Sequence, residues 1–130
     1  MSAPSRDDII KLKIAKAMNS LSAAEKMLEY NFTSATLNRL YYACFYAATA
    51  LLFSKDIFTK THSGFKQMLG LHFISTGILS RDLRKFYAII FDTRISSDYD
   101  DFAMADDKMV KAFSITTNEF ALSVRKIFDF

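Results

Sequence analysis

The stretch from about Thr33 to Ser54 is apolar on nearly every side of the helix that it is expected to form. One stripe at helical spacing carries Leu37, Leu40, Tyr41, Cys44, Ala48, Leu51 and Leu52. A second face carries Arg39, Tyr42, Phe45, Tyr46, Thr49 and Phe53. A helix that is apolar nearly all round has to be covered on both sides. In a chain of this size we expect a second copy, and hence a homodimer, to cover one side; the alternative is a central helix within a single chain.

Helical periodicity continues through the rest of the chain. Apolar residues recur at three- and four-residue steps over about Asp7 to Glu29, Gly64 to Ile74, Arg81 to Ser97 and Ala105 to Phe128. Helix N-caps are expected at Ser5, at Thr61 or Ser63, and at Ser80. One Pro and three Gly are too few turn residues for an all-β domain. We predict an all-α fold, a single domain over residues 1–130 built as an antiparallel up-and-down bundle of four to five helices.

Composition excludes several classes of protein. Apolar residues make up 51% of the chain and charged residues 24%, which excludes a disordered protein. Cys44 is the single cysteine, so no internal disulfide forms, and no Cys/His cluster indicates a metal or another cofactor. No apolar stretch reaches the roughly 20 residues that span a bilayer, and the charged N-terminal segment is unlike a signal peptide. We therefore expect a cytoplasmic protein without a membrane partner, in which Cys44 is a small apolar filler.

Charge is unevenly distributed along the chain. Residues 31–91 hold seven Lys or Arg against two Asp, a net charge of +5. Residues 92–107 hold Arg94 against six Asp, a net charge of −5. The plainest interpretation is a solvated helix followed by a solvated loop.

Arg94 departs from that plain interpretation. Leu83, Tyr87 and Ile90 form an apolar stripe, and one more turn of the same stripe reaches Arg94. An inward-facing guanidinium needs a carboxylate or a phosphate on its N–H donors. Asp98 lies one turn further on, with Tyr99 beside it. Two interpretations remain: an Arg94–Asp98 pair that closes the helix end, or an arginine that binds a phosphate, oriented by Asp98 and assisted by the Tyr99 hydroxyl.

A second candidate group is Arg39 with Tyr42 and Tyr46, which recur about one turn apart. These residues suit a nucleotide or RNA base or phosphate, although Arg and Tyr are also favoured at dimer interfaces. His62 and His72 are the only histidines. We interpret His62 as a capping or packing residue and His72 as a residue at the edge of the core, with a long-range partnership of either with Arg94 as the alternative.

Four stretches together resemble the HEPN superfamily, in particular its small stand-alone prokaryotic branch. They are NRLYYACFYAATALLFSK (38–55), KTHSGF (60–65), HFISTGILSRDL (72–83) and FDTRISSDYDDF (91–102), which cover about half of the chain. The resemblance implies a helical bundle that dimerises and that is paired with a minimal nucleotidyltransferase in a toxin–antitoxin module. Active members resemble metal-independent ribonucleases, with an Arg followed by a His after four to six residues.

Arg94 fits the arginine of that pattern, but no histidine follows it within residues 95–101. Tyr99 stands where the histidine would be at the shortest spacing. RNA cleavage needs a group that titrates near neutral pH, whereas a tyrosine has a pKa of about 10 and neighbouring aspartates raise that pKa further. The resemblance therefore favours a nucleotide- or RNA-binding dimer, whose Tyr99 is a candidate acceptor of a nucleotidyl group. The alternatives are a ribonuclease toxin with an Arg-x4-Tyr motif and a purely structural scaffold.

Overall fold

The computed structural model describes residues 3–59, 61–74, 77, 79–99 and 106–128, except for the side chains of His62, Phe73, Ile74, Ser97, Asp98 and Tyr99. The described elements are α1 (Arg6–Glu29), α2 (Thr33–Ser54), α3 (His62–Leu69), a π-helical segment η1 (Gly70–Ile74), α4 (Arg81–Tyr99) and α5 (Asp107–Phe128). The described residues form no strand, so the predicted all-α fold is confirmed. None of these helices is both long and apolar enough to cross a membrane.

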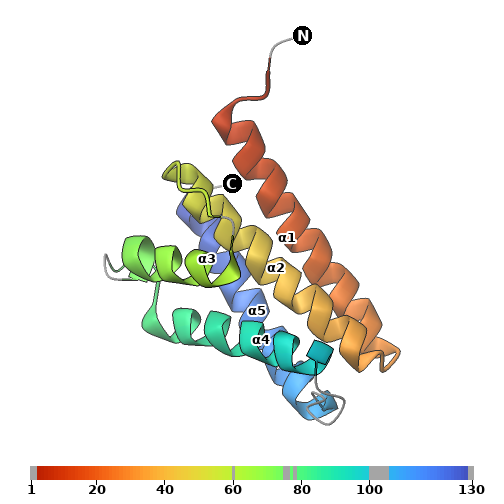
Figure 1. Cartoon of the computed structure of the whole chain (residues 1–130). Helices are drawn as coiled ribbons and strands as arrows, with labels where there is room; N and C mark the ends of the chain where they lie inside the picture. The colour runs from red at the N-terminus through yellow and green to blue at the C-terminus, as the bar shows by residue number, and fades with distance from the viewer. Residues whose placement is uncertain (1–2, 60, 75–76, 78, 100–105, 129–130) are drawn as a thin grey trace.

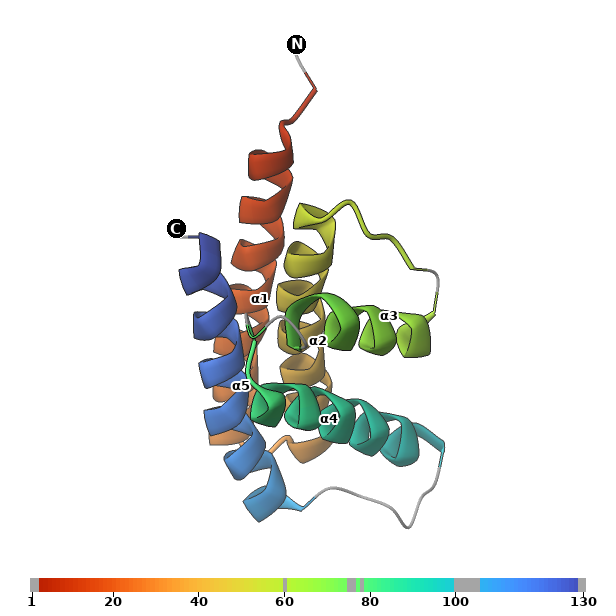
Figure 2. The same ribbon diagram turned by 90° about the vertical axis from the view of Figure 1, so that its left-hand side faces the viewer.

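The helices form two groups. Helices α1, α2 and α5 lie alongside one another, whereas α3 and α4 lie across α2 (Figure 1; Figure 2). Helices α1 and α2 are antiparallel because only the short turn of residues 30–32 joins them, and α3 and α4 are also antiparallel to each other. The predicted helical bundle is thus confirmed, and it has a crossed arrangement that brings α4 over the middle of α2.

Side-chain caps mark the starts of three helices, as the sequence predicts. The Ser5 hydroxyl accepts a hydrogen bond from the Asp8 N–H (3.1 Å), and the Asp8 carboxylate accepts one from the Ser5 N–H (3.2 Å). The Thr61 hydroxyl accepts from the Gly64 N–H (3.0 Å), and Ser80 caps α4 in the same way through the Leu83 N–H (3.2 Å). Each cap satisfies an N–H that the helix itself leaves without a partner.

Helix α2 is the centre of the fold. Its fully buried residues include Leu40, Tyr41, Cys44, Ala47, Ala48 and Leu51. Helix α1 packs along it together with α5, while α4 and α3 contact it from the other side. Within one chain the first stripe of α2 is buried, whereas the residues of its second face are only half-buried: Arg39, Tyr42, Phe45, Tyr46, Thr49 and Phe53. The homodimer and the central helix within a single chain therefore both stay open, and the homodimer stays a prediction.

Cys44 fills the core, as predicted. Its side chain is fully buried, and its Sγ donates to the Thr117 Oγ1 at 3.8 Å. Burial raises the pKa of the Cys44 thiol to about 12, and the hydrogen bond to Thr117 opposes that rise. The thiolate is the reactive form of cysteine, so Cys44 is inert in the folded protein.

Candidate functional site: two arginines at one tyrosine ring

Arg94 lies on the face of α4 that packs against α2, as the apolar stripe predicts. Tyr87 and Ile90, the preceding members of the stripe, are fully buried, and Arg94 is half-buried at its outer end. The guanidinium carbon of Arg94 is 4.9 Å from the centroid of the Tyr41 ring and 5.3 Å from that of Tyr42. The guanidinium of Arg94 thus packs against two aromatic rings of α2, and cation–π attraction stabilises its positive charge there.

The Tyr42 ring also contacts a second guanidinium, that of Arg39. The Arg39 guanidinium carbon lies 5.1 Å from the centroid of the Tyr42 ring. The Asn38 Oδ1 accepts hydrogen bonds from Arg39 Nη2 (2.9 Å) and Nε (3.3 Å), which hold the guanidinium in place. The Arg94 candidate and the Arg39 candidate, separate in the sequence, therefore meet at one half-buried ring. We call Arg39, Tyr42 and Arg94 the two-arginine site.

Tyr46 extends the row of aromatic rings along α2. Its ring centroid is 6.0 Å from that of Tyr42, with an interplanar angle of 39°. Lys16 of α1 places its Nζ 5.7 Å from the Tyr46 centroid. Nothing in the local pattern of α1 reveals which ring of another helix Lys16 will meet. The structure therefore adds Lys16 to the group of Arg39, Tyr42 and Tyr46.

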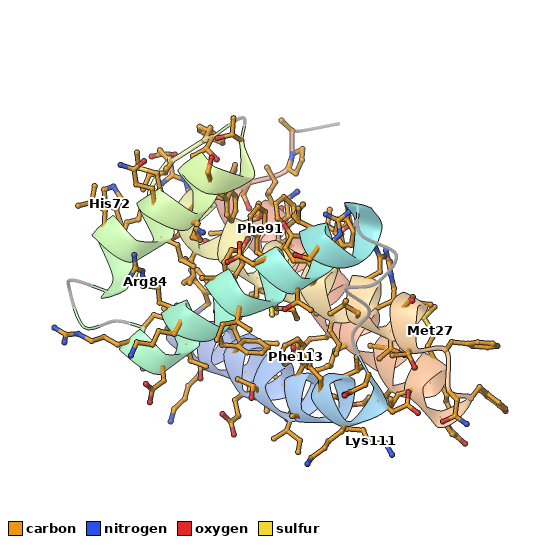
Figure 3. All side chains as sticks on the ribbon, turned by 60° about the horizontal axis from the view of Figure 1, so that its bottom comes forward. Met27, His72, Arg84, Phe91, Lys111 and Phe113 are labelled. Atoms are coloured by element: carbon orange, nitrogen blue, oxygen red, sulfur yellow. The ribbon has the colours of Figure 1, made fainter. Side chains whose placement is uncertain are left out.

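Lys66 is a further cation that the sequence did not single out. Its Nζ lies 5.4 Å from the centroid of the Phe91 ring. The Phe91 ring in turn lies 6.1 Å from the ring of Tyr41, which is the ring beneath Arg94. Rings of α2 and α4 thus connect Lys66 to the two-arginine site, and Figure 3 labels Phe91 on α4.

The arrangement combines features that suit a nucleotide or RNA. A cation–π contact uses the charge of a guanidinium and not its N–H donors, and such donors suit phosphate oxygens. An aromatic ring with an exposed portion offers a surface on which a base can stack. Arg39, Tyr42 and Arg94 are all half-buried, so each is both held in place and reachable from solvent.

The phenols beneath the site are not bases. Burial raises the pKa of Tyr41 to about 12, and the charge of Arg94 opposes that rise. Burial also raises the pKa of Tyr87, by more. Both hydroxyls therefore keep their protons near neutral pH, and the general base of a cleavage reaction has to be another group.

Several predicted site residues lie at the limit of the described chain. The backbone of Asp98 and Tyr99 forms the last turn of α4, one turn beyond Arg94, but their side chains lie outside the described residues. The Arg94–Asp98 pair and the role of Tyr99 therefore stay predictions, as does the role of the His62 side chain. His72 is half-buried in η1. In Figure 3, His72 and Arg84 are labelled near the start of α4. Within the described ranges, no three potential metal ligands lie together.

Comparisons with known proteins agree with this architecture. A family model described as "HEPN domain" matches residues 10–127. A "UPF0332 protein" of Thermotoga maritima is 28% identical over 124 residues, which cover 95% of this chain and 94% of that protein. The "Putative toxin MJ0142" of Methanocaldococcus jannaschii is 37% identical over 87 residues, which cover 67% of this chain and 59% of the relative. A second protein of that organism, "Putative toxin MJ0605", is 32% identical over 90 residues, which cover 69% of this chain and 67% of the relative.

Proposed function

The chain belongs to the HEPN domain family, and from that premise we propose that it is a cytoplasmic, nucleotide- or RNA-binding homodimer that forms a toxin–antitoxin-type pair with a minimal nucleotidyltransferase. Two relatives that carry the word toxin in their names support the toxin-type setting. Binding is assigned to the two-arginine site.

The observation that carries the proposal is the convergence of two guanidiniums on the Tyr42 ring. Arg39 lies 5.1 Å from its centroid and Arg94 lies 5.3 Å from it, from two different helices. Two guanidiniums that contact one ring repel each other, and the aromatic ring offsets part of that repulsion. A phosphate bound by these arginines would offset more of it, and a base stacked at Tyr42 or Tyr46 would fit the same row of rings.

Binding is favoured over cleavage because the phenols described beneath the site cannot act as the base for cleavage. The buried phenols of Tyr41 and Tyr87 have raised pKa values, so neither accepts a proton near neutral pH. Tyr99 stands at the sequence position of the family histidine. In this proposal Arg94 therefore binds and orients a phosphate, and cutting of the RNA is not part of the function.

Fluorescence anisotropy with a labelled single-stranded RNA of about 12 nucleotides tests the proposal. We expect Arg94→Gln and Arg39→Gln each to weaken binding about tenfold, because each removes a charged contact to phosphate. Arg125→Gln is the matched control, since Arg125 is an exposed arginine at the far end of α5. If the wild-type protein leaves the RNA free, or if the two site variants bind as tightly as the control, the proposal fails.

A further inference from the structure

A basic groove lies between α3 and α4, apart from the two-arginine site. Lys66, Arg84, Lys85, Ala88 and Ile89 line it, and it has a volume of about 350 Å³. Three of its five residues are cations, and Ile89 exposes 51% of its surface beside them. Figure 3 shows Arg84 reaching from α4 toward the end of α3. The groove thus combines positive charge with a small apolar floor.

Packing holds two of the three cations in place. A Cβ atom at position 70 would lie 3.1 Å from Arg84 Nε and 3.7 Å from its Cζ, so the guanidinium rests against a surface that only a glycine leaves open. This glycine starts the π-helical segment η1, a type of irregularity that is frequent at functional sites. Lys66 is half-buried, with its Nζ 5.4 Å from the Phe91 ring. Arg84 is exposed but its guanidinium lies against Gly70.

No carboxylate neutralises the groove within the described part of the chain. The salt bridges found there join Arg6 to Asp56 and Lys26 to Glu29, and neither includes a residue of the groove. The described acids of α4, Asp82 and Asp92, are both exposed and do not line the groove. Three cations around one hollow repel one another, and an anion bound among them would remove that repulsion.

The groove is connected to the two-arginine site through aromatic rings. Lys66 contacts Phe91, the Phe91 ring lies 6.1 Å from that of Tyr41, and Arg94 lies on Tyr41. Tyr41 is fully buried, so a ligand cannot follow that ring, but Phe91 is half-buried and lies about one turn before Arg94 on α4. A polyanion held at Arg94 could therefore pass over Phe91 to the groove. A mononucleotide bound at the two-arginine site has no further phosphate that could bind in the groove. An RNA chain has one phosphate per nucleotide.

We infer that the α3–α4 groove binds phosphates of an RNA chain that extends from the two-arginine site, so that the ligand is a single-stranded RNA of several nucleotides and not a mononucleotide. This inference rests on the proposed function. Lys66, Arg84 and Lys85 contact the phosphates, and the exposed surface of Ile89 lies against a ribose or a base. Recognition by the groove is independent of sequence, because it addresses the backbone.

The test compares a trinucleotide with a single-stranded RNA of about 12 nucleotides, each labelled and titrated at several salt concentrations. We expect the wild-type protein to bind the longer RNA more tightly. The triple variant K66Q/R84Q/K85Q should lose about tenfold in affinity for the longer RNA and leave the trinucleotide unaffected. A plot of the logarithm of its affinity for the longer RNA against the logarithm of the salt concentration should have a slope shallower by about 2. Each phosphate contact to a single strand contributes about 0.7 to that slope, and the variant loses three contacts. The variant K66R/R84K/K85R, which keeps the charges, should retain most of the affinity.

The matched control is K108Q/K111Q/K126Q, which removes the same charge from exposed positions of α5. Circular dichroism checks that each variant is folded. If the groove variant and the control bind the longer RNA equally well, the inference is overturned while the two-arginine site stands. If the groove variant changes self-association or binding of a poly-aspartate peptide and leaves RNA binding intact, the groove is a protein-contact surface and the inference is likewise overturned. If the wild-type protein binds neither RNA, the proposed function fails and the inference with it.

Discussion

The guanidinium carbon of Arg94 lies 4.9 Å from the centroid of the Tyr41 ring, and that ring is fully buried. The candidate site is therefore built directly on the core and not on a surface loop. Tyr41 lies in the middle of α2, which every other α-helix except the short α3 contacts extensively. A substitution of Arg94 should consequently weaken ligand binding and, to a smaller extent, lower the stability of the fold.

The first prediction concerns the coupling between Arg94 and Tyr42. We expect Arg94→Gln and Tyr42→Leu each to lower the free energy of unfolding. The effect of the double variant should differ from the sum of the two single effects by about 0.5–1 kcal/mol, the usual strength of a cation–π pair that is partly exposed. Urea unfolding of the two single variants and the double variant measures it. Strict additivity would show that the 5.3 Å contact between them contributes nothing to stability.

The second prediction concerns alkaline pH. Burial raises the pKa of Tyr41 and of Cys44 to about 12 each, and it raises that of Tyr87 further. All three groups are neutral when protonated, so the unfolded chain loses these protons at lower pH than the folded protein does. The contribution of these three groups to the free energy of unfolding is therefore fully present below about pH 8.5, the pKa of a cysteine in an unfolded chain. This contribution is lost as the pH rises toward 12.

Thermal unfolding followed by circular dichroism between neutral pH and pH 11 tests that decline. The melting temperature should fall over the alkaline range, and Tyr41→Phe should show a shallower fall because it has no phenol to ionise. Absorbance at the tyrosinate band gives an independent readout, since Tyr41 and Tyr87 should ionise only as the protein unfolds. A Tyr41→Phe profile with the same slope as the wild type would contradict the assignment.

The third prediction concerns Gly70. The backbone there is right-handed helical (φ −60°, ψ −47°), so alanine suits it and should gain up to about 1 kcal/mol in helix propensity. The added Cβ would push the Arg84 side chain away, since it would lie 3.1 Å from Nε. We expect Gly70→Ala to leave stability equal or higher and to weaken binding of the longer RNA severalfold. Gly77→Ala is an unsuitable control because Gly77 has a φ of 78°, where alanine is strained.

The fourth prediction concerns Cys44. Its thiol is fully buried, so it should not react with an aromatic disulfide reagent in the folded protein and should react fully in denaturant. The rate of labelling under native conditions then reports transient opening of the core around α2. Fast labelling of the native protein would show that this region is less tightly packed than the structure indicates.

The fifth prediction concerns the homodimer. Because the first stripe of α2 is already buried within one chain, dimerisation should contribute little to the stability of the core, and the monomer should stay folded on dilution. Sedimentation equilibrium should give a mass of two 14.8 kDa chains at high concentration. Circular dichroism should stay unchanged as the dimer dissociates. A monomeric mass at all concentrations would remove the homodimer from the proposal.

Much of the fold follows from local sequence patterns. The helices, their caps at Ser5, Thr61 and Ser80, and the inward face of Arg94 all depend on spacing along a single helix, which the sequence displays. The cover of α2 could not be predicted in the same way. An all-round apolar helix fits both a subunit interface and a central position, and no local pattern reveals that α4 and α3 pack across α2 and leave its second face half-buried.

The site shows the same limit. The spacing of Arg39, Tyr42 and Tyr46 and the position of Arg94 each indicated a candidate, but their meeting at one ring depends on the angle at which α4 crosses α2. That angle results from the fit of side chains between helices, to which no motif corresponds. The partnership of Lys66 with Phe91 and the closeness of Arg84 to Gly70 are tertiary in the same sense. A charge count along the chain found these cations without showing that they surround a groove.

Photo-crosslinking with an RNA that carries 4-thiouridine, followed by mass spectrometry, tests the two-arginine site most directly. Trypsin cuts after Arg39 and Lys55, which isolates the peptide Leu40–Lys55 with Tyr41, Tyr42 and Tyr46. The account predicts that the main crosslink lies in this peptide, at Tyr42 or Tyr46, and that Arg94→Gln greatly reduces it. Crosslinks confined to peptides of α5, or a Leu40–Lys55 crosslink of equal yield in Arg94→Gln, would contradict it.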